Sequence, residues 1–155
     1  KGIEIMMRVL FVCVHNSARS QIAEAYLNQL GQGNFLAESA GLEPTSIYPL
    51  VIKVLKEDGI DISGKKTASV FKYFQEGRQY DVVVTVCDQA NSEKCPVFPS
   101  SGLNLHWSFP DPTAFQGSEE EKTEQVRWLR DEIKHRVEEF IHVMGQNEIS
   151  AKSDE

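Results

Sequence analysis

Residues 8–20 read Arg-Val-Leu-Phe-Val-Cys-Val-His-Asn-Ser-Ala-Arg-Ser, and they indicate how the chain begins to fold. The segment from Arg8 to Val14 is almost entirely apolar and rich in β-branched residues, which is typical of a central parallel strand covered on both faces. From Ser17 to Leu30 the apolar side chains recur at helical spacing instead. A buried strand that a short polar loop joins to a helix is the first unit expected of a parallel α/β fold.

The rest of the chain repeats this alternation. Further strands are expected at 35–40, 80–86 and 103–107, and helices at 48–58 and 69–75. A long last helix opens with the capping box Ser118-Glu119-Glu120-Glu121. We therefore predict an α/β fold with a four-stranded parallel sheet and helices on both faces, because the crossover connections are right-handed. The alternative is an α+β arrangement whose last strand is antiparallel.

Length, charge and cysteine count limit the possible classes of protein. The 155 residues fit one domain, which we place at 7–146, with residues 1–6 outside the fold and 147–155 as a flexible tail. With 23 acidic and 16 basic residues the net charge is −7, so nucleic acid is not an expected partner. No apolar run approaches the about 20 residues needed to span a bilayer, so a membrane is not expected either. Three cysteines are too few for a secreted disulfide scaffold, and no signal peptide is evident, so we expect a cytoplasmic protein.

The loop after the first strand has the composition of an oxyanion-binding site. Cys13 and Arg19 flank five residues, and the loop leads directly into a helix N-terminus. Backbone N–H groups there can converge on a tetrahedral anion, and an arginine can clamp it with two hydrogen bonds. The same environment favours the thiolate form of Cys13 and makes it a nucleophile, whereas the alternative is a buried core cysteine. The predicted oxyanion-binding residues are Val14, His15, Asn16, Ser17, Ala18, Arg19 and Ser20.

Other reactive side chains follow the later strands, and the carboxyl ends of parallel strands meet at one edge of a sheet. We therefore expect Cys87, Cys95 and Asp111 near Cys13. Asp111 lies between two prolines that stiffen its loop, and it could donate a proton to a departing oxygen or be only a turn residue. Cys87 and Cys95 fit a redox pair, two structural thiols or, together with a histidine, a metal site.

Several motifs together resemble the low-molecular-weight protein tyrosine phosphatase superfamily, and within it the thioredoxin-coupled arsenate reductases. The resemblance runs from about Met7 to about Gly145. It rests on Val-Leu-Phe-Val-Cys-Val-His-Asn-Ser-Ala-Arg-Ser-Gln-Ile-Ala-Glu-Ala at 9–25, Glu-Ser-Ala-Gly at 38–41, Val-Thr-Val-Cys-Asp at 84–88, Lys-Cys-Pro-Val-Phe-Pro at 94–99 and Trp-Ser-Phe-Pro-Asp-Pro at 107–112.

The resemblance implies a relay of three cysteines. Cys13 attacks arsenate held by the loop and Arg19, and Asp111 protonates the departing oxygen. Cys87 then attacks Cys13, arsenite leaves, and a 13–87 disulfide forms. Cys95 next attacks Cys87 and moves the disulfide to the 87–95 pair, where thioredoxin reduces it. Arsenate is accordingly the expected substrate and thioredoxin the expected partner.

The resemblance also suggests one cofactor and one competing function. Some relatives bind potassium beside the loop through residues that match Asn16, Glu24 and Ser39; no other cofactor is expected. The alternative function is a phosphatase that hydrolyses phosphoesters through a Cys13 phosphoenzyme, because phosphate and arsenate share charge and shape. Such a phosphatase has no use for Cys87 and Cys95. A third interpretation is an oxyanion sensor that cycles its thiols without turnover.

Overall fold

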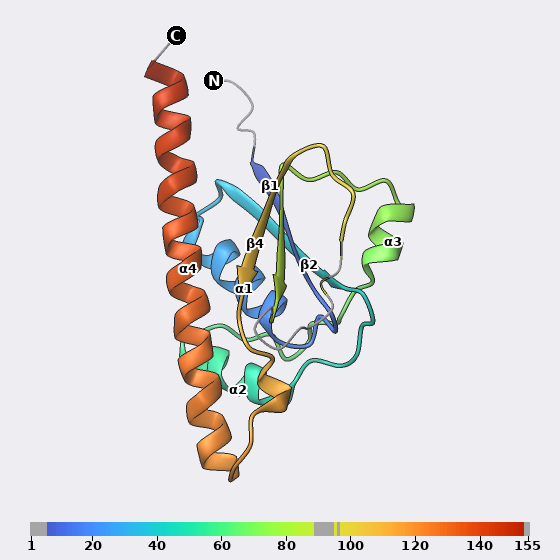
Figure 1. Ribbon diagram of the computed structural model, residues 1–155. Helices are drawn as coiled ribbons and strands as arrows, with labels where there is room; N and C mark the ends of the chain where they lie inside the picture. Colours follow the sequence, from blue (N-terminus) through green and yellow to red (C-terminus); the bar gives the residue numbers. More distant parts are fainter. Residues whose placement is uncertain (1–5, 89–94, 96, 154–155) are drawn as a thin grey trace.

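The chain forms a four-stranded parallel sheet flanked by helices (Figure 1). The computed structural model describes residues 6–88, 95 and 97–153. The elements in chain order are β1 (Met7–Cys13), α1 (Arg19–Leu30), β2 (Phe35–Gly41), α2 (Pro49–Glu57), α3 (Val70–Gln75), β3 (Val82–Cys87), β4 (Leu103–Ser108) and α4 (Glu119–Ser153). The strand order is β2-β1-β3-β4. Each neighbouring pair is parallel, which confirms the predicted fold and excludes an antiparallel last strand.

Helices cover both faces of the sheet. Helices α1, α2 and α4 lie on one side and α3 lies on the other (Figure 1). Side chains along a strand alternate between the faces, so Phe11 packs in the larger core and Leu10 in the smaller one. Both residues are fully buried, which explains why the first strand is apolar at consecutive positions.

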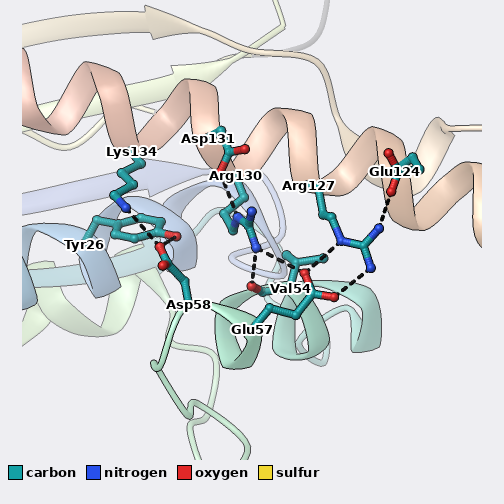
Figure 2. A network of polar contacts seen from close by, with 9 residues as sticks. All are labelled: Tyr26, Val54, Glu57, Asp58, Glu124, Arg127, Arg130, Asp131 and Lys134. Atoms are coloured by element: carbon teal, nitrogen blue, oxygen red, sulfur yellow. Dashed lines mark hydrogen bonds and ion pairs between the residues drawn. The ribbon is translucent and has the colours of Figure 1, made fainter.

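Charged side chains of α4 bind the C-terminal end of α2 (Figure 2). Arg127 donates two hydrogen bonds to the Glu57 carboxylate, at 2.8 and 2.7 Å. Arg130 Nη1 donates to the Val54 carbonyl oxygen at 2.8 Å. One turn further along α4, Lys134 contacts the Asp58 carboxylate at 3.1 Å. These contacts supply positive charge where α2 ends and leaves carbonyl groups without helical partners.

The last helix is longer than the sequence suggested. The helix was expected to give way to a flexible tail after Gln146, but α4 continues to Ser153. A single glycine, Gly145, costs a helix only about 1 kcal/mol, and no proline follows it. Among the residues that the structure describes, no helix combines the length and the apolar character needed to cross a membrane.

Candidate active site

The predicted reactive residues lie at the carboxyl edge of the sheet. Cys13 ends β1 and Cys87 ends β3, and these two strands are neighbours with Val12 paired to Thr85. Strand β4 lies beside β3, and Asp111 follows it by three residues. The strand order therefore brings together at one edge three segments that are far apart in the sequence.

The loop between β1 and α1, residues 14–18, is called the oxyanion loop below. Its backbone is hydrogen-bonded on the outside by the segment that follows β2. The carbonyl oxygens of Cys13, Val14 and His15 accept hydrogen bonds from the N–H groups of residues 42, 43 and 45, and the Ser17 carbonyl accepts one from residue 48. The His15 ring adds a contact with the Glu43 carbonyl oxygen at 3.1 Å. In a peptide plane the N–H and C=O groups point in opposite directions. Carbonyls fixed outward therefore turn the loop amides inward, as an oxyanion site requires.

The sulfur of Cys13 lies among hydrogen-bond donors of the loop. The residue is only 2% exposed. Its Sγ lies 2.8 Å from Ser20 Oγ, and the Asn16 backbone N–H donates to it at 3.2 Å. Asn16 also donates from Nδ2 to Ser20 Oγ at 2.7 Å, which orients the serine hydroxyl toward the sulfur. Hydrogen bonds to a sulfur anion stabilise it, so this surrounding suits a thiolate nucleophile.

Two backbone features permit the tight loop. Asn16 has a φ of 53°, in the left-handed region that asparagine tolerates better than most residues. Gly41 approaches the loop so closely that a Cβ there would lie 2.8 Å from the Asn16 nitrogen and 2.9 Å from the Val14 oxygen. The glycine of Glu-Ser-Ala-Gly is therefore required by the close approach of β2 to the loop.

Arg19 and Asp111 face each other across the mouth of the loop. Arg19 is 3% exposed and donates from Nη1 to the Phe109 carbonyl oxygen at 3.2 Å. Its Nη2 lies 3.9 Å from Asp111 Oδ2. The other Asp111 oxygen accepts from the backbone N–H and the hydroxyl of Thr113, at 3.0 and 2.8 Å. Asp111 is therefore a turn residue, and its second oxygen still points toward the loop arginine.

Cys87 and Cys95 form a disulfide in the structure. His106, on β4, places its Nε2 at 2.9 Å from Cys87 Sγ and 3.9 Å from Cys95 Sγ. The three ligand atoms lie within 4.8 Å of one another, so a metal could meet them only when the thiols are reduced. The register that pairs Thr85 with His106 explains the approach of the imidazole, which the sequence did not reveal.

A polar cluster beside the loop includes one residue that sequence reasoning missed. The buried Glu24 carboxylate accepts from the Ser39 hydroxyl at 2.9 Å and contacts Lys65 Nζ at 2.6 Å. Burial raises the pKa of Glu24 above its ordinary value, while Lys65 and the hydrogen bonds oppose this rise. Lys65 lies in a polar connection between elements, and no sequence signal indicated where its side chain would be directed.

Comparison with known proteins agrees with this geometry. A family model described as low molecular weight phosphotyrosine protein phosphatase matches residues 8–152. The arsenate reductase of Bacillus subtilis (strain 168) is 39% identical over 132 residues, which cover 85% of this chain and 93% of that protein. The glutaredoxin arsenate reductase of Synechocystis sp. is 33% identical over 136 residues, 88% of this chain and 97% of that protein.

Solved structures give the same result. A structure titled as an arsenate reductase in reduced state has a TM-score of 0.71 and 32% identity, covering 90% of this chain and 99% of that one. The thioredoxin-dependent arsenate reductase of Corynebacterium glutamicum has a TM-score of 0.65 and 27% identity, covering 92% of this chain and 63% of that one. Because the family model matches nearly the whole chain and the relatives align over most of their length, this chain belongs to the low molecular weight phosphotyrosine protein phosphatase family.

Proposed function

We propose that this chain reduces arsenate to arsenite through a relay of Cys13, Cys87 and Cys95, and that thioredoxin regenerates it. The observation that carries the proposal is the Cys87–Cys95 disulfide at the same sheet edge as the oxyanion loop. A phosphatase needs the loop, the arginine and the aspartate, but a reductase also needs a pair of thiols to accept oxidising equivalents. The similarity to arsenate reductases supports the same conclusion.

The first step forms a bond between sulfur and arsenic. The loop amides and the Arg19 guanidinium hold three arsenate oxygens and neutralise their charge. The Cys13 thiolate attacks arsenic, and Asp111 donates a proton to the departing hydroxyl group, which leaves as water. Arsenic is still pentavalent at this point. The Phe109 carbonyl holds Arg19 in place, so the guanidinium is oriented before the anion arrives.

The second step transfers electrons. The Cys87 thiolate attacks Cys13 Sγ, the sulfur–arsenic bond breaks, and its electron pair remains on arsenic, which leaves as trivalent arsenite. The disulfide formed joins Cys13 to Cys87. Alternation along β3 directs Cys87 to the α3 face, whereas Cys13 packs in the core on the α1 side. The end of β3 must therefore rearrange from the disulfide-bonded conformation before Cys87 can reach Cys13.

The third step moves the disulfide outward. The Cys95 thiolate attacks Cys87, and Cys13 leaves as a thiolate that Ser20 and Asn16 stabilise. Cys87 is fully buried, whereas Cys95 is less buried, so a bulky protein reductant reaches Cys95 more easily. Thiolate attack by thioredoxin on Cys95 then releases Cys87, whose sulfur lies beside the His106 imidazole.

The experiment that tests the proposal is arsenate-dependent NADPH oxidation with thioredoxin and thioredoxin reductase. We expect multiple turnovers with this pair and none without thioredoxin. Glutaredoxin with glutathione replaces thioredoxin in a parallel assay, because one relative is named for that reductant. Higher turnover with glutaredoxin would overturn the thioredoxin assignment, and no arsenite with either reductant would overturn arsenate reduction.

The Cys95→Ser variant tests the relay itself. It should release about one arsenite per chain and then stall with thioredoxin, with Cys13 joined to Cys87 in a tryptic digest. Oxidised wild type should instead contain the 87–95 disulfide. Wild-type turnover by Cys95→Ser would show that the third thiol is dispensable. Hydrolysis of a small aryl phosphate by both proteins in the reduced form, before arsenate is added, would show that the loop is intact in the variant.

A further inference from the structure

A buried polar cluster is joined to the oxyanion loop by hydrogen bonds from Gln21 to Asn16. Glu24, Ser39 and Gln21 are 7%, 2% and 1% exposed. The side chain of Lys65 reaches into this cluster from a connection 44 residues away in the sequence from Gln21, and 32% of it remains exposed. Its ammonium group lies 2.6 Å from Glu24 Oε2 and 2.8 Å from Gln21 Oε1.

The residues expected to bind potassium are engaged by hydrogen-bond donors of the chain. Asn16 Oδ1 accepts from Gln21 Nε2 at 3.0 Å and from the Ala68 backbone N–H at 2.9 Å. The Ser39 hydroxyl donates to Glu24 Oε1, and the ammonium of Lys65 contacts Glu24 Oε2. Potassium needs several oxygens that converge on it with free lone pairs. These side chains, with a lysine ammonium among them, do not fit that requirement.

We propose that Lys65 is a positioning residue that supplies, as part of the chain, the positive charge that a potassium ion would bring to this cluster. A buried carboxylate without a cation is costly, because its desolvation is not compensated. The ammonium group of Lys65 compensates the negative charge of the Glu24 carboxylate directly. A tethered ammonium is present at every salt composition, so the loop should not depend on the potassium concentration.

Hydrogen bonds connect Lys65 to the nucleophile. Lys65 donates to the Gln21 side-chain oxygen, and Gln21 Nε2 donates to both the backbone and side-chain oxygens of Asn16, at 3.1 and 3.0 Å. Asn16 in turn donates to Ser20 Oγ, which contacts Cys13 Sγ. Because Asn16 holds the left-handed turn of the loop, loss of the ammonium should loosen the loop as well as expose an unpaired carboxylate.

The test compares wild type with Lys65→Met in potassium chloride and in choline chloride at equal ionic strength. Two readouts are used: the thermal unfolding midpoint and the Kd of inorganic phosphate, which stands in for the oxyanion. Neither readout requires arsenate reduction, so failure here is distinguishable from failure of the proposed function. Wild type should give the same midpoint within about 1 °C in both salts.

Lys65→Met should lose about 3–10 °C in choline chloride and bind phosphate about three- to tenfold more weakly, since a buried acceptor loses its donor. Potassium should restore part of both losses in this variant. Lys65→Arg keeps a cation and should behave like wild type. Lys66→Met removes the exposed neighbouring lysine and is the matched control, expected to match wild type in both salts. If Lys65→Met is too unstable to measure, Lys65→Gln carries the same comparison.

Three results would overturn the proposal. The first is wild type that gains stability or phosphate affinity specifically from potassium. The second is a Lys65→Met protein that matches wild type in choline chloride. The third is a Lys65→Met protein that is weakened but does not respond to potassium, because the ammonium would then not stand in for that ion.

Discussion

Replacement of Asp111 by asparagine separates its chemical role from its structural one. Asp111 Oδ1 caps the turn at Pro112–Ala114 through two hydrogen bonds from Thr113, at 3.0 and 2.8 Å, and asparagine can still accept them. The other oxygen lies 3.9 Å from Arg19, too far for a strong hydrogen bond, and the Phe109 carbonyl keeps its own hydrogen bond to Arg19. Asp111→Asn should therefore keep the fold and the loop while it removes the acidic proton.

The expected loss follows from general acid catalysis. Without a proton donor for the departing oxygen, the rate of the first chemical step should fall by about 10²–10⁴-fold, or about 2.7–5.4 kcal/mol in activation free energy. Thr113→Val is the matched control: it removes the hydroxyl donor at 2.8 Å but leaves the carboxylate. It should cost about 1 kcal/mol of stability and change the rate less than about fivefold.

The assay is single-turnover release of arsenite from pre-reduced protein, with arsenate in excess and quenched samples, so that thioredoxin does not limit the rate. The thermal midpoint of each variant is measured in parallel. An Asp111→Asn rate within about threefold of wild type would refute the role of general acid. A Thr113→Val rate as low as that of Asp111→Asn would show that the position of the turn, rather than the proton, is what matters.

Further variants test the loop, the last helix and the loss of stability at acid pH. Cys13→Ser should abolish arsenite release, because a serine hydroxyl is not an anion at neutral pH, and turnover above a few per cent of wild type would exclude Cys13 as the nucleophile. Gly41→Ala should abolish phosphate binding measured by calorimetry, since its Cβ would lie 2.8 Å from the Asn16 nitrogen, and wild-type affinity would contradict the close approach. Arg130→Met removes the hydrogen bond to the Val54 carbonyl and the ion pairs with Glu57 and Asp131 (Figure 2). It should lower the free energy of unfolding in urea by about 1 kcal/mol, and no change would mean that these contacts together do not stabilise the attachment of α4. Hydrogen bonds from Tyr26 and Lys134 hold the pKa of Asp58 below its usual 3.8, so its contribution to stability is present above pH 4 and is lost as the pH falls further. Asp58→Asn should therefore make the urea midpoint depend less steeply on pH below pH 4. A pH dependence as steep as that of wild type would show that Asp58 does not cause it.

Local sequence patterns were sufficient to predict the strands, the helices and part of the candidate site. The apolar run of β1, the helical spacing after it and the capping box at Ser118 each depend on residues a few positions apart. The capping box forms as expected, with Ser118 Oγ accepting from the Glu121 N–H at 3.1 Å. The grouping of Cys13 with Arg19 was also foreseeable, because a strand, a loop and a helix N-terminus follow one another directly. Parallel strands then determine that later loops meet at the same edge.

Contacts between distant segments came only from the tertiary structure. The resemblance placed Ser39 beside Glu24, and the structure contains that hydrogen bond. The sequence did not indicate that Lys65 contacts Glu24 or that His106 contacts Cys87, because Lys65 approaches from a connection and His106 from the register of β4 on β3. The attachment of α4 to α2 likewise depends on how distant side chains pack together. Periodicity reports which face of an element is apolar, whereas the pairing of polar groups depends on register and on the path of the loops. A single sequence carries no local signal for those two quantities, so the cation beside the loop became visible only in three dimensions.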